Sequence, residues 1–179
     1  PTRCFPLHSP CSNDTIHRYL VIHQSPEVEN PEKGLKRLHD EWGWQSLEGG
    51  ELIANGAMMN DIESTELLRQ FLTERLEEDT ITPFVYTHRD RAGRTASFVH
   101  YPNRLHANSL IGRIHTAGTQ DTLLQHRVNA EVALHDESEP AASVLDSVLQ
   151  EGRPVYLMGN TVAGFMRELS EEIDRRSIE

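Results

Sequence analysis

The last third of the chain shows the clearest pattern of apolar and polar positions. Residues 128–134 alternate between apolar and polar side chains, which is the period of a strand with one buried face. Residues 141–150 instead carry apolar side chains at helical spacing, and a short apolar run follows at 154–158. The pattern predicts a strand, a helix, a second strand and, after the turn 159–161, a final amphipathic helix.

This order of elements predicts an α/β sheet. A strand that is followed by a helix and a further strand favours parallel pairing, so we expect the strands near 128–134 and 154–158 to be parallel and adjacent or one strand apart. Parallel sheets bind ligands at the carboxyl ends of their strands. The alternation places Leu134 on the buried face and leaves His135 and Asp136 outside the core at such a strand end.

The first half of the chain is predicted to contain two helices. Asparagine followed by proline is typical of a helix start, and apolar positions then continue over 31–42. Asn60 and Glu63 resemble a capping box for a second helix that runs to about residue 78. Short strands are predicted at 18–23 and 52–54, and residues 1–15 look irregular.

The middle of the chain is predicted to form a β-hairpin. Residues 80–88 and 94–101 are both rich in β-forming side chains, and the loop between them contains glycine. Residues 110–114 are typical of one further strand. We therefore predict one α/β domain over residues 1–179, with a Rossmann-like, mostly parallel sheet flanked by helices and a β-hairpin extension.

Composition narrows the classes of function. A chain of 179 residues suits one domain, and its formal net charge of −11 argues against nonspecific binding to nucleic acid or to anionic membranes. It has no apolar run of about 20 residues, the length that spans a bilayer. Its start lacks the pattern of a signal peptide, and its two cysteines form no disulfide framework. These features predict a cytoplasmic protein.

Two segments of the C-terminal third carry a resemblance to a known group of proteins. Residues 132–136 read VALHD, and residues 151–157 read EGRPVYL. Together they resemble the nucleoside 2-deoxyribosyltransferases and related SLOG-type Rossmann-like domains, over about residues 126–160. The resemblance implies a Rossmann-like fold and nucleotide-type ligands. It does not extend to the glycosyl chemistry, because Val144 stands where that family has its nucleophilic glutamate.

Basic and imidazole side chains gather between residues 86 and 115, although the protein is acidic. Arginine matches the geometry of phosphate and carboxylate, and the turn after 154–158 leads into a helix whose first amides can hold an anion. The predicted ligand-binding residues are Arg89, Arg94, His100, Arg104, His106, Asn160 and Thr161. A solvated hairpin and ordinary helix capping would explain the same residues.

Two further clusters are candidate sites. His135 and Asp136 follow a predicted strand, where an acid–base group is useful, so we predict them as catalytic residues, with a polar loop as the alternative. The chain also holds four soft metal ligands near its start, but their spacing matches no familiar zinc motif, so we predict no metal site. These ligands are Cys4, His8, Cys11 and His17.

The leading hypothesis is a domain that binds a nucleotide or similar phosphorylated small molecule. If it is an enzyme, it hydrolyses or modifies that ligand. The first alternative is a noncatalytic, acidic protein-interaction module, with a protein partner or a second copy of the chain. The second alternative is a histidine-based, RNA-cleaving toxin or nuclease, against which the acidic charge argues. The sequence identifies no cofactor.

Overall fold

The computed structural model describes residues 43–57, 59, 61–74, 76, 79–88, 92–159 and 164–178, with the backbone alone over 92–97. The predicted strand at 18–23, the predicted helix at 31–42 and the segment 1–15 lie outside these residues. The expectation of one domain over the whole chain therefore stays a prediction.

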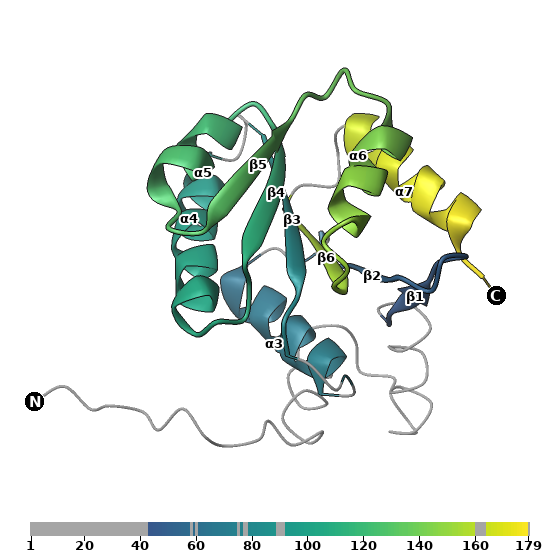
Figure 1. Ribbon diagram of the computed structural model, residues 1–179. Coiled ribbons are helices and arrows are strands. Elements are labelled where there is room, and N and C mark those ends of the chain that lie inside the picture. Colours follow the sequence, from purple (N-terminus) through teal and green to yellow (C-terminus); the bar gives the residue numbers. More distant parts are fainter. Residues whose placement is uncertain are drawn as a thin grey trace, which may run out of the picture. The chain divides into compact units, whose positions relative to one another are not determined.

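Six strands form one sheet, in the order β1-β2-β6-β3-β4-β5 (Figure 1). The pairs β2–β6, β6–β3, β3–β4 and β4–β5 are parallel, and β1 pairs with β2 antiparallel. The strands are β1 (Gln45–Ser46), β2 (Leu52–Asn55), β3 (Thr82–Thr87), β4 (Arg113–Gly118), β5 (Glu131–His135) and β6 (Val155–Gly159). The mostly parallel α/β fold that the sequence predicted is confirmed.

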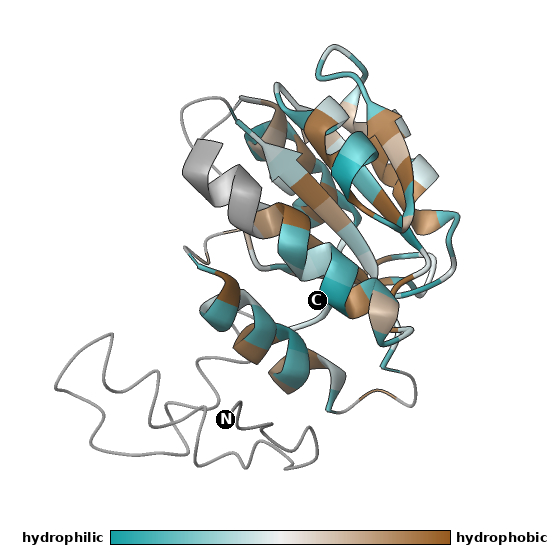
Figure 2. Ribbon diagram, turned by 90° about the vertical axis from the view of Figure 1, so that its left-hand side faces the viewer, coloured by the Kyte–Doolittle hydropathy of each residue, from teal (hydrophilic) through white to brown (hydrophobic). Residues whose placement is uncertain are grey.

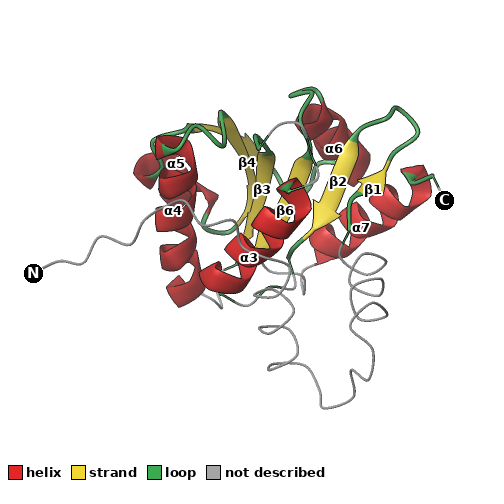
Figure 3. Ribbon diagram, turned by 90° about the horizontal axis from the view of Figure 1, so that it is seen from below, coloured by secondary structure: helices red, strands yellow, loops and turns green. Residues whose placement is uncertain are grey.

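Helices cover both faces of this sheet, as the view along its edge shows (Figure 3). The helices are α3 (Ile62–Thr73), α4 (Ala92–Ala107), α5 (Asp121–Arg127), α6 (Ala141–Leu149) and α7 (Gly164–Arg176). Leu157 of β6 packs with α6 and α7, whereas the next residue back, Tyr156, donates its hydroxyl hydrogen bond to Thr65 of α3. Neighbouring residues of a strand point to opposite faces, so α3 and the pair α6–α7 lie on opposite sides. No described helix is long and apolar enough to cross a membrane.

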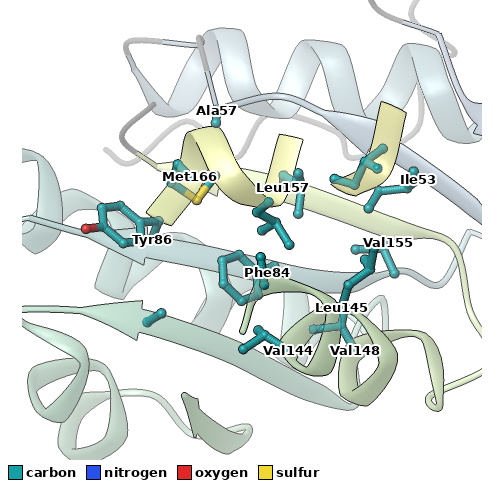
Figure 4. Packing of buried hydrophobic residues seen from close by; sticks show 14 of the residues in the cluster. Ile53, Ala57, Phe84, Tyr86, Val144, Leu145, Val148, Val155, Leu157 and Met166 are labelled. Atoms are coloured by element: carbon teal, nitrogen blue, oxygen red, sulfur yellow. The ribbon is translucent and has the colours of Figure 1, made fainter. Parts of the chain in front are cut away.

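The hydrophobic core lies mainly between the sheet and the α6–α7 layer. Side chains from β2, β3 and β6 meet those of the two helices there (Figure 4). The helices carry both hydrophobic and hydrophilic residues (Figure 2), as expected for elements with one buried side. The core includes Ile53, Phe84, Val144, Leu145, Val148, Val155, Leu157, Phe165, Met166, Leu169 and Ile173.

The predicted strands at 52–54, 80–88, 128–134 and 154–158 and the helix at 141–150 are all present, with shifted ends. Their spacing in the sheet differs from the prediction. The strands β5 and β6 are parallel but have both β3 and β4 between them, rather than at most one strand. The strands β4 and β5 lie on one side of β3, whereas β6 lies on its other side. The local pattern of strand and helix does not indicate on which side of β3 a later strand will pair.

The predicted hairpin over 80–101 is wrong. The first half is β3, but residues 94–101 belong to α4, which continues to Ala107 and contains Pro102. Phe98, Tyr101 and Leu105 are buried at helical spacing, three and four residues apart. The short alternation at 97–101 resembled a strand, and the proline obscured the longer helical period. The antiparallel hairpin of the described residues is the β1–β2 pair.

The helix α3 begins one residue later than the predicted cap. Asp61, rather than Asn60, is the N-cap, and its carboxylate accepts hydrogen bonds from the Ser64 amide at 2.7 Å and the Ser64 hydroxyl at 2.8 Å. The helix ends at Thr73, short of the predicted residue 78. An aspartate is as good a cap as an asparagine, so the sequence offered two equivalent starts.

Truncation of a leucine to alanine should lower the free energy of unfolding much more at a buried position than at an exposed one. Leu157 is 1% exposed in the centre of the sheet, so Leu157→Ala should lower the free energy of unfolding by about 2–5 kcal/mol. Leu123 on α5 is 37% exposed, and Leu123→Ala should change it by less than about 0.5 kcal/mol. Urea denaturation followed by circular dichroism measures both values. Equal losses in the two variants would contradict this assignment of the core.

Candidate functional site

The carboxyl edge of the sheet has a point where neighbouring strands lead in opposite directions. The strands β3 and β6 are adjacent and parallel, with Tyr86 opposite Gly159 near their ends. After β3 the chain passes through α4 to β4, whereas β6 leads into α7, which packs on the other face. The segments that follow the two strands therefore diverge. Such a switch point is where open α/β sheets hold their ligands.

Two glycines keep this edge closely packed. Gly118 ends β4 and Gly159 ends β6, and both have a φ of +109°. A Cβ atom at Gly118 would collide with the carbonyl oxygen of Thr87, and one at Gly159 would collide with that of Tyr86. Glycine is therefore required at both strand ends, for its backbone conformation and for the space.

An unsatisfied acceptor lies at the same edge. The Thr87 hydroxyl donates to the carbonyl oxygen of Ala117 at 3.3 Å and accepts from the amide of Gln120 at 3.1 Å. The side-chain oxygen of Gln120 is buried and has no hydrogen-bond partner among the described residues. A buried acceptor of this kind costs free energy unless a donor reaches it. Gln120 is thus a candidate contact for a ligand that carries a donor group.

The loop after β5 reaches across β4 to β3. The Tyr86 hydroxyl, near the end of β3, donates a hydrogen bond to the Glu137 carboxylate, and burial together with this carboxylate raises the pKa of Tyr86. Asp136 accepts a hydrogen bond from the Ser138 amide at 2.8 Å, and its own amide donates to Glu139 at 2.7 Å. The hydrogen bonds from Ser138 lower the pKa of Asp136, so this exposed residue is a carboxylate that orders the loop.

His135 is buried, which contradicts the expectation that it is exposed. It is 8% exposed, whereas Leu134, which the alternation placed in the core, is 38% exposed. The side chain of His135 lies on the α6 side of the sheet with His115 of β4. Its Nε2 is 2.9 Å from Nδ1 of His115, and the two rings stack with centroids 5.1 Å apart. The sequence predicted the wrong face because β5 is an edge strand that only partly buries either side.

The histidine pair continues into a chain of charged groups. Nε2 of His115 lies 3.4 Å from the Glu151 carboxylate, which also accepts from Arg113 at 2.8 Å. Arg113 bonds Glu131 as well, at the exposed start of β5. Burial lowers the pKa of His115, and the neighbouring His135 lowers it further, while the Glu151 carboxylate acts in the opposite direction. Burial also lowers the pKa of His135, against the attraction of Glu139.

The predicted ligand-binding residues are not brought together by the described structure. Arg89, Asn160 and Thr161 lie outside the described residues, and the Arg94 side chain is not described. His100, Arg104 and His106 are exposed on α4. Since α4 starts at the carboxyl edge and rises about 1.5 Å per residue, Arg104 lies about 18 Å along the helix from that edge.

Sequence reasoning missed several residues of this edge. Tyr86 and Gln120 gave no signal, because their roles depend on contacts between separate strands and loops. The sequence predicted His135 at a strand end, but no pattern paired it with His115, which lies within the basic stretch. The described residues contain no group of three or more histidine, cysteine or acidic side chains that could hold a metal. The four candidate ligands near the start of the chain, for which no metal site was predicted, lie outside the described residues.

A cavity of about 560 Å³ lies at the opposite, amino edge of the sheet. It is lined by the β1–β2 turn, the end of α6 and the end of α7. Its two arginines are already held by carboxylates, because Arg175 and Arg176 both bond Glu172, and Arg176 also bonds Asp146. The two arginines of this cavity are therefore less available to an added anion than unpaired arginines would be.

The buried histidines should make stability depend on pH. Their folded-state pKa values are lowered, so the unfolded chain binds protons first as the pH falls. Their contribution is complete above the unfolded pKa of about 6.5 and is lost below it, with a slope of up to about 1.4 kcal/mol per pH unit for each histidine. The double variant His115→Gln/His135→Gln should flatten this slope in urea titrations between pH 7.5 and 5.5.

The exposed His106 supplies the matched control. His106→Gln should leave the pH dependence of the unfolding free energy unchanged. A slope that is the same in the double variant and the unsubstituted protein would show that the pair does not titrate with unfolding.

A comparison with known protein families gives a match. No curated protein matches the chain. Residues 46–176, well over half of the chain, match the family described as the C-terminal domain of the poly-gamma-glutamate synthase CapB. This span begins in β1 and ends with α7, so it contains the whole described sheet except Gln45. The match does not name the nucleoside 2-deoxyribosyltransferases or SLOG-type domains, and that resemblance extends only to the α/β fold. The chain therefore belongs to the family of CapB C-terminal domains.

Proposed function

We propose that this domain serves the synthesis of poly-gamma-glutamate by binding a nucleotide, or a similar phosphorylated small molecule, at the carboxyl edge between β3 and β6. The observation that carries the proposal is the switch point, where two adjacent parallel strands end side by side and their following segments diverge to opposite faces. Gly159 is the last residue of β6, and it has no side chain that would occupy the space at this strand end.

The chemistry implied by the family name supports this choice of ligand. Joining the carboxylate of one glutamate to the amine of the next forms an amide, which is unfavourable in water unless the carboxylate is activated. A nucleoside triphosphate supplies that activation by phosphorylating the carboxylate, after which the amine displaces phosphate. A domain that serves such a synthesis thus has a reason to bind phosphate groups.

The sequence places fitting residues directly after the two strands. Arg89 follows the end of β3 by two positions, and Asn160 and Thr161 follow β6 and precede α7. Arginine pairs with phosphate through two parallel hydrogen bonds. Asparagine and threonine, together with the amides of a helix start, suit an anion. Hydrolysis or modification of the ligand by this domain alone remains a prediction.

The two alternative functions receive less support from the described residues. Glu172 on α7 is one of the carboxylates that an acidic interaction surface would use, but Arg175 and Arg176 both bond it and, with Arg175 foremost, lower its pKa to about 2. The RNA-cleaving alternative has the acidic net charge against it, and α4 occupies half of the segment that was predicted to form a basic hairpin. No observation favours either alternative over the nucleotide proposal.

Substitution of two arginines from the same stretch tests the proposal. Arg89→Ala should weaken binding of ATP by about 1–3 kcal/mol, because one charge-assisted contact to phosphate is lost. Arg104→Ala should leave the affinity unchanged, since Arg104 is exposed toward the other end of α4. Isothermal titration calorimetry with ATP, ADP and AMP measures the affinities.

Two outcomes of these titrations would contradict the proposal. Absence of binding for all three nucleotides by the unsubstituted chain would remove the nucleotide site. Equal loss of affinity in the two variants would move the phosphate contact away from the β3–β6 edge.

A further inference from the structure

We propose that His135 is a hydrogen-bond acceptor for an ammonium group of a ligand, at the β5 end of the carboxyl edge, and that His115 and Glu151 are positioning residues that fix the tautomer of His135. This inference takes only its location from the proposed function. It adds to the same edge a second contact region, which would bind a cationic group rather than a phosphate.

The hydrogen bonds determine which nitrogen of each ring carries the proton. A carboxylate only accepts, so Nε2 of His115 donates to Glu151. The Nδ1 of a neutral His115 is then an acceptor, and Nε2 of His135 must donate to it across 2.9 Å. A neutral His135 that donates through Nε2 keeps a lone pair on Nδ1. The chain from Glu151 to His135 therefore ends in an acceptor.

Among the residues that the structure describes, this terminal acceptor has no hydrogen-bond partner. His135 is 8% exposed, and its Nδ1 has no hydrogen bond to any described residue. The ring itself is held in place, because it stacks on His115 and lies 6.2 Å from the ring of Phe84. A fixed, nearly buried acceptor at the end of a strand suits recognition of a donor group from outside.

The charges around His135 favour a cationic donor. Asp136 and Glu139 are exposed carboxylates within four residues of it, and the Glu139 charge acts on the imidazole. The Arg113 side chain lies beyond His115 and is paired with two carboxylates. A phosphate next to Asp136 and Glu139 would be repelled, whereas an ammonium group is attracted. The two ends of the edge thus prefer opposite charges.

The two ends of the edge are far enough apart for two different ligands to bind at the same time. Neighbouring strands lie about 4.8 Å apart, so β5 lies about 10 Å from β3 and about 14 Å from β6 along the sheet. A phosphorylated ligand at the switch point would leave the β5 end open. An amino acid or peptide amino group is the matching ligand class for that end.

Nitrogen-15 NMR of the full chain tests the positioning residues. At pH 7.5 both histidines should be neutral with the proton on Nε2. Glu151→Ala should give a mixture of tautomers at His115 and His135, and Glu151→Gln should restore the Nε2-protonated form, because the amide oxygen still accepts. Glu131→Ala is the matched control, since Glu131 bonds Arg113 but neither histidine. Unchanged tautomers in Glu151→Ala would overturn the assignment.

The same spectra test the ligand class with L-glutamate and N-acetyl-L-glutamate. Both probes carry two carboxylates, but only the first has an ammonium group. L-glutamate should shift the Nδ1 resonance of His135, N-acetyl-L-glutamate should not, and Glu151→Ala should weaken the response to L-glutamate about tenfold. No shift with L-glutamate, or equal shifts with both probes, would overturn the ammonium site. The nucleotide titrations are independent, so either proposal can fail while the other stands.

Discussion

The parallel pairing of β3 with β6 is the constraint on which the rest of the structure depends. It inserts the last strand of the chain between β2 and β3, so β6 has a partner on each side and forms the centre of the sheet. Because β3 continues to β4 and β6 continues into α7, the same pairing creates the switch point. Packing of the backbone there is close enough that Gly159 cannot carry a side chain. The fold and the candidate site therefore have one origin.

Local pattern was enough to predict the elements from residue 128 onward and the parallel class of the sheet. The helix at 141–150 and the strand at 154–158 are strongly periodic, and each packs a continuous apolar surface. Local pattern failed where an element has mixed signals. In α4 the buried Tyr101 precedes Pro102, so β-forming side chains and a proline conceal a helix that its contacts stabilise. Strand order was not predictable, because it depends on which long-range pairing buries more surface.

The candidate site was predictable only in its position. The expectation that His135 stands at a carboxyl strand end is confirmed, but its burial and its partners are set by β4 and by the segment after α6. Glu151 is sixteen positions from His135 in sequence and lies between α6 and β6. Contacts of this kind arise from the register of β4 and β5, in which Ala117 lies opposite His135 and His115 lies two positions earlier.

The central claim is that the carboxyl edge at β3 and β6 is the binding edge. Backbone amide NMR during titration with ATP tests it most directly, because every described strand end reports separately. We expect the largest shifts at Thr87, Gly118 and Gly159, with none at Gly152 and Leu47, which lie at the amino edge. Shifts confined to the amino edge, around the cavity between the β1–β2 turn and α6, would contradict the account.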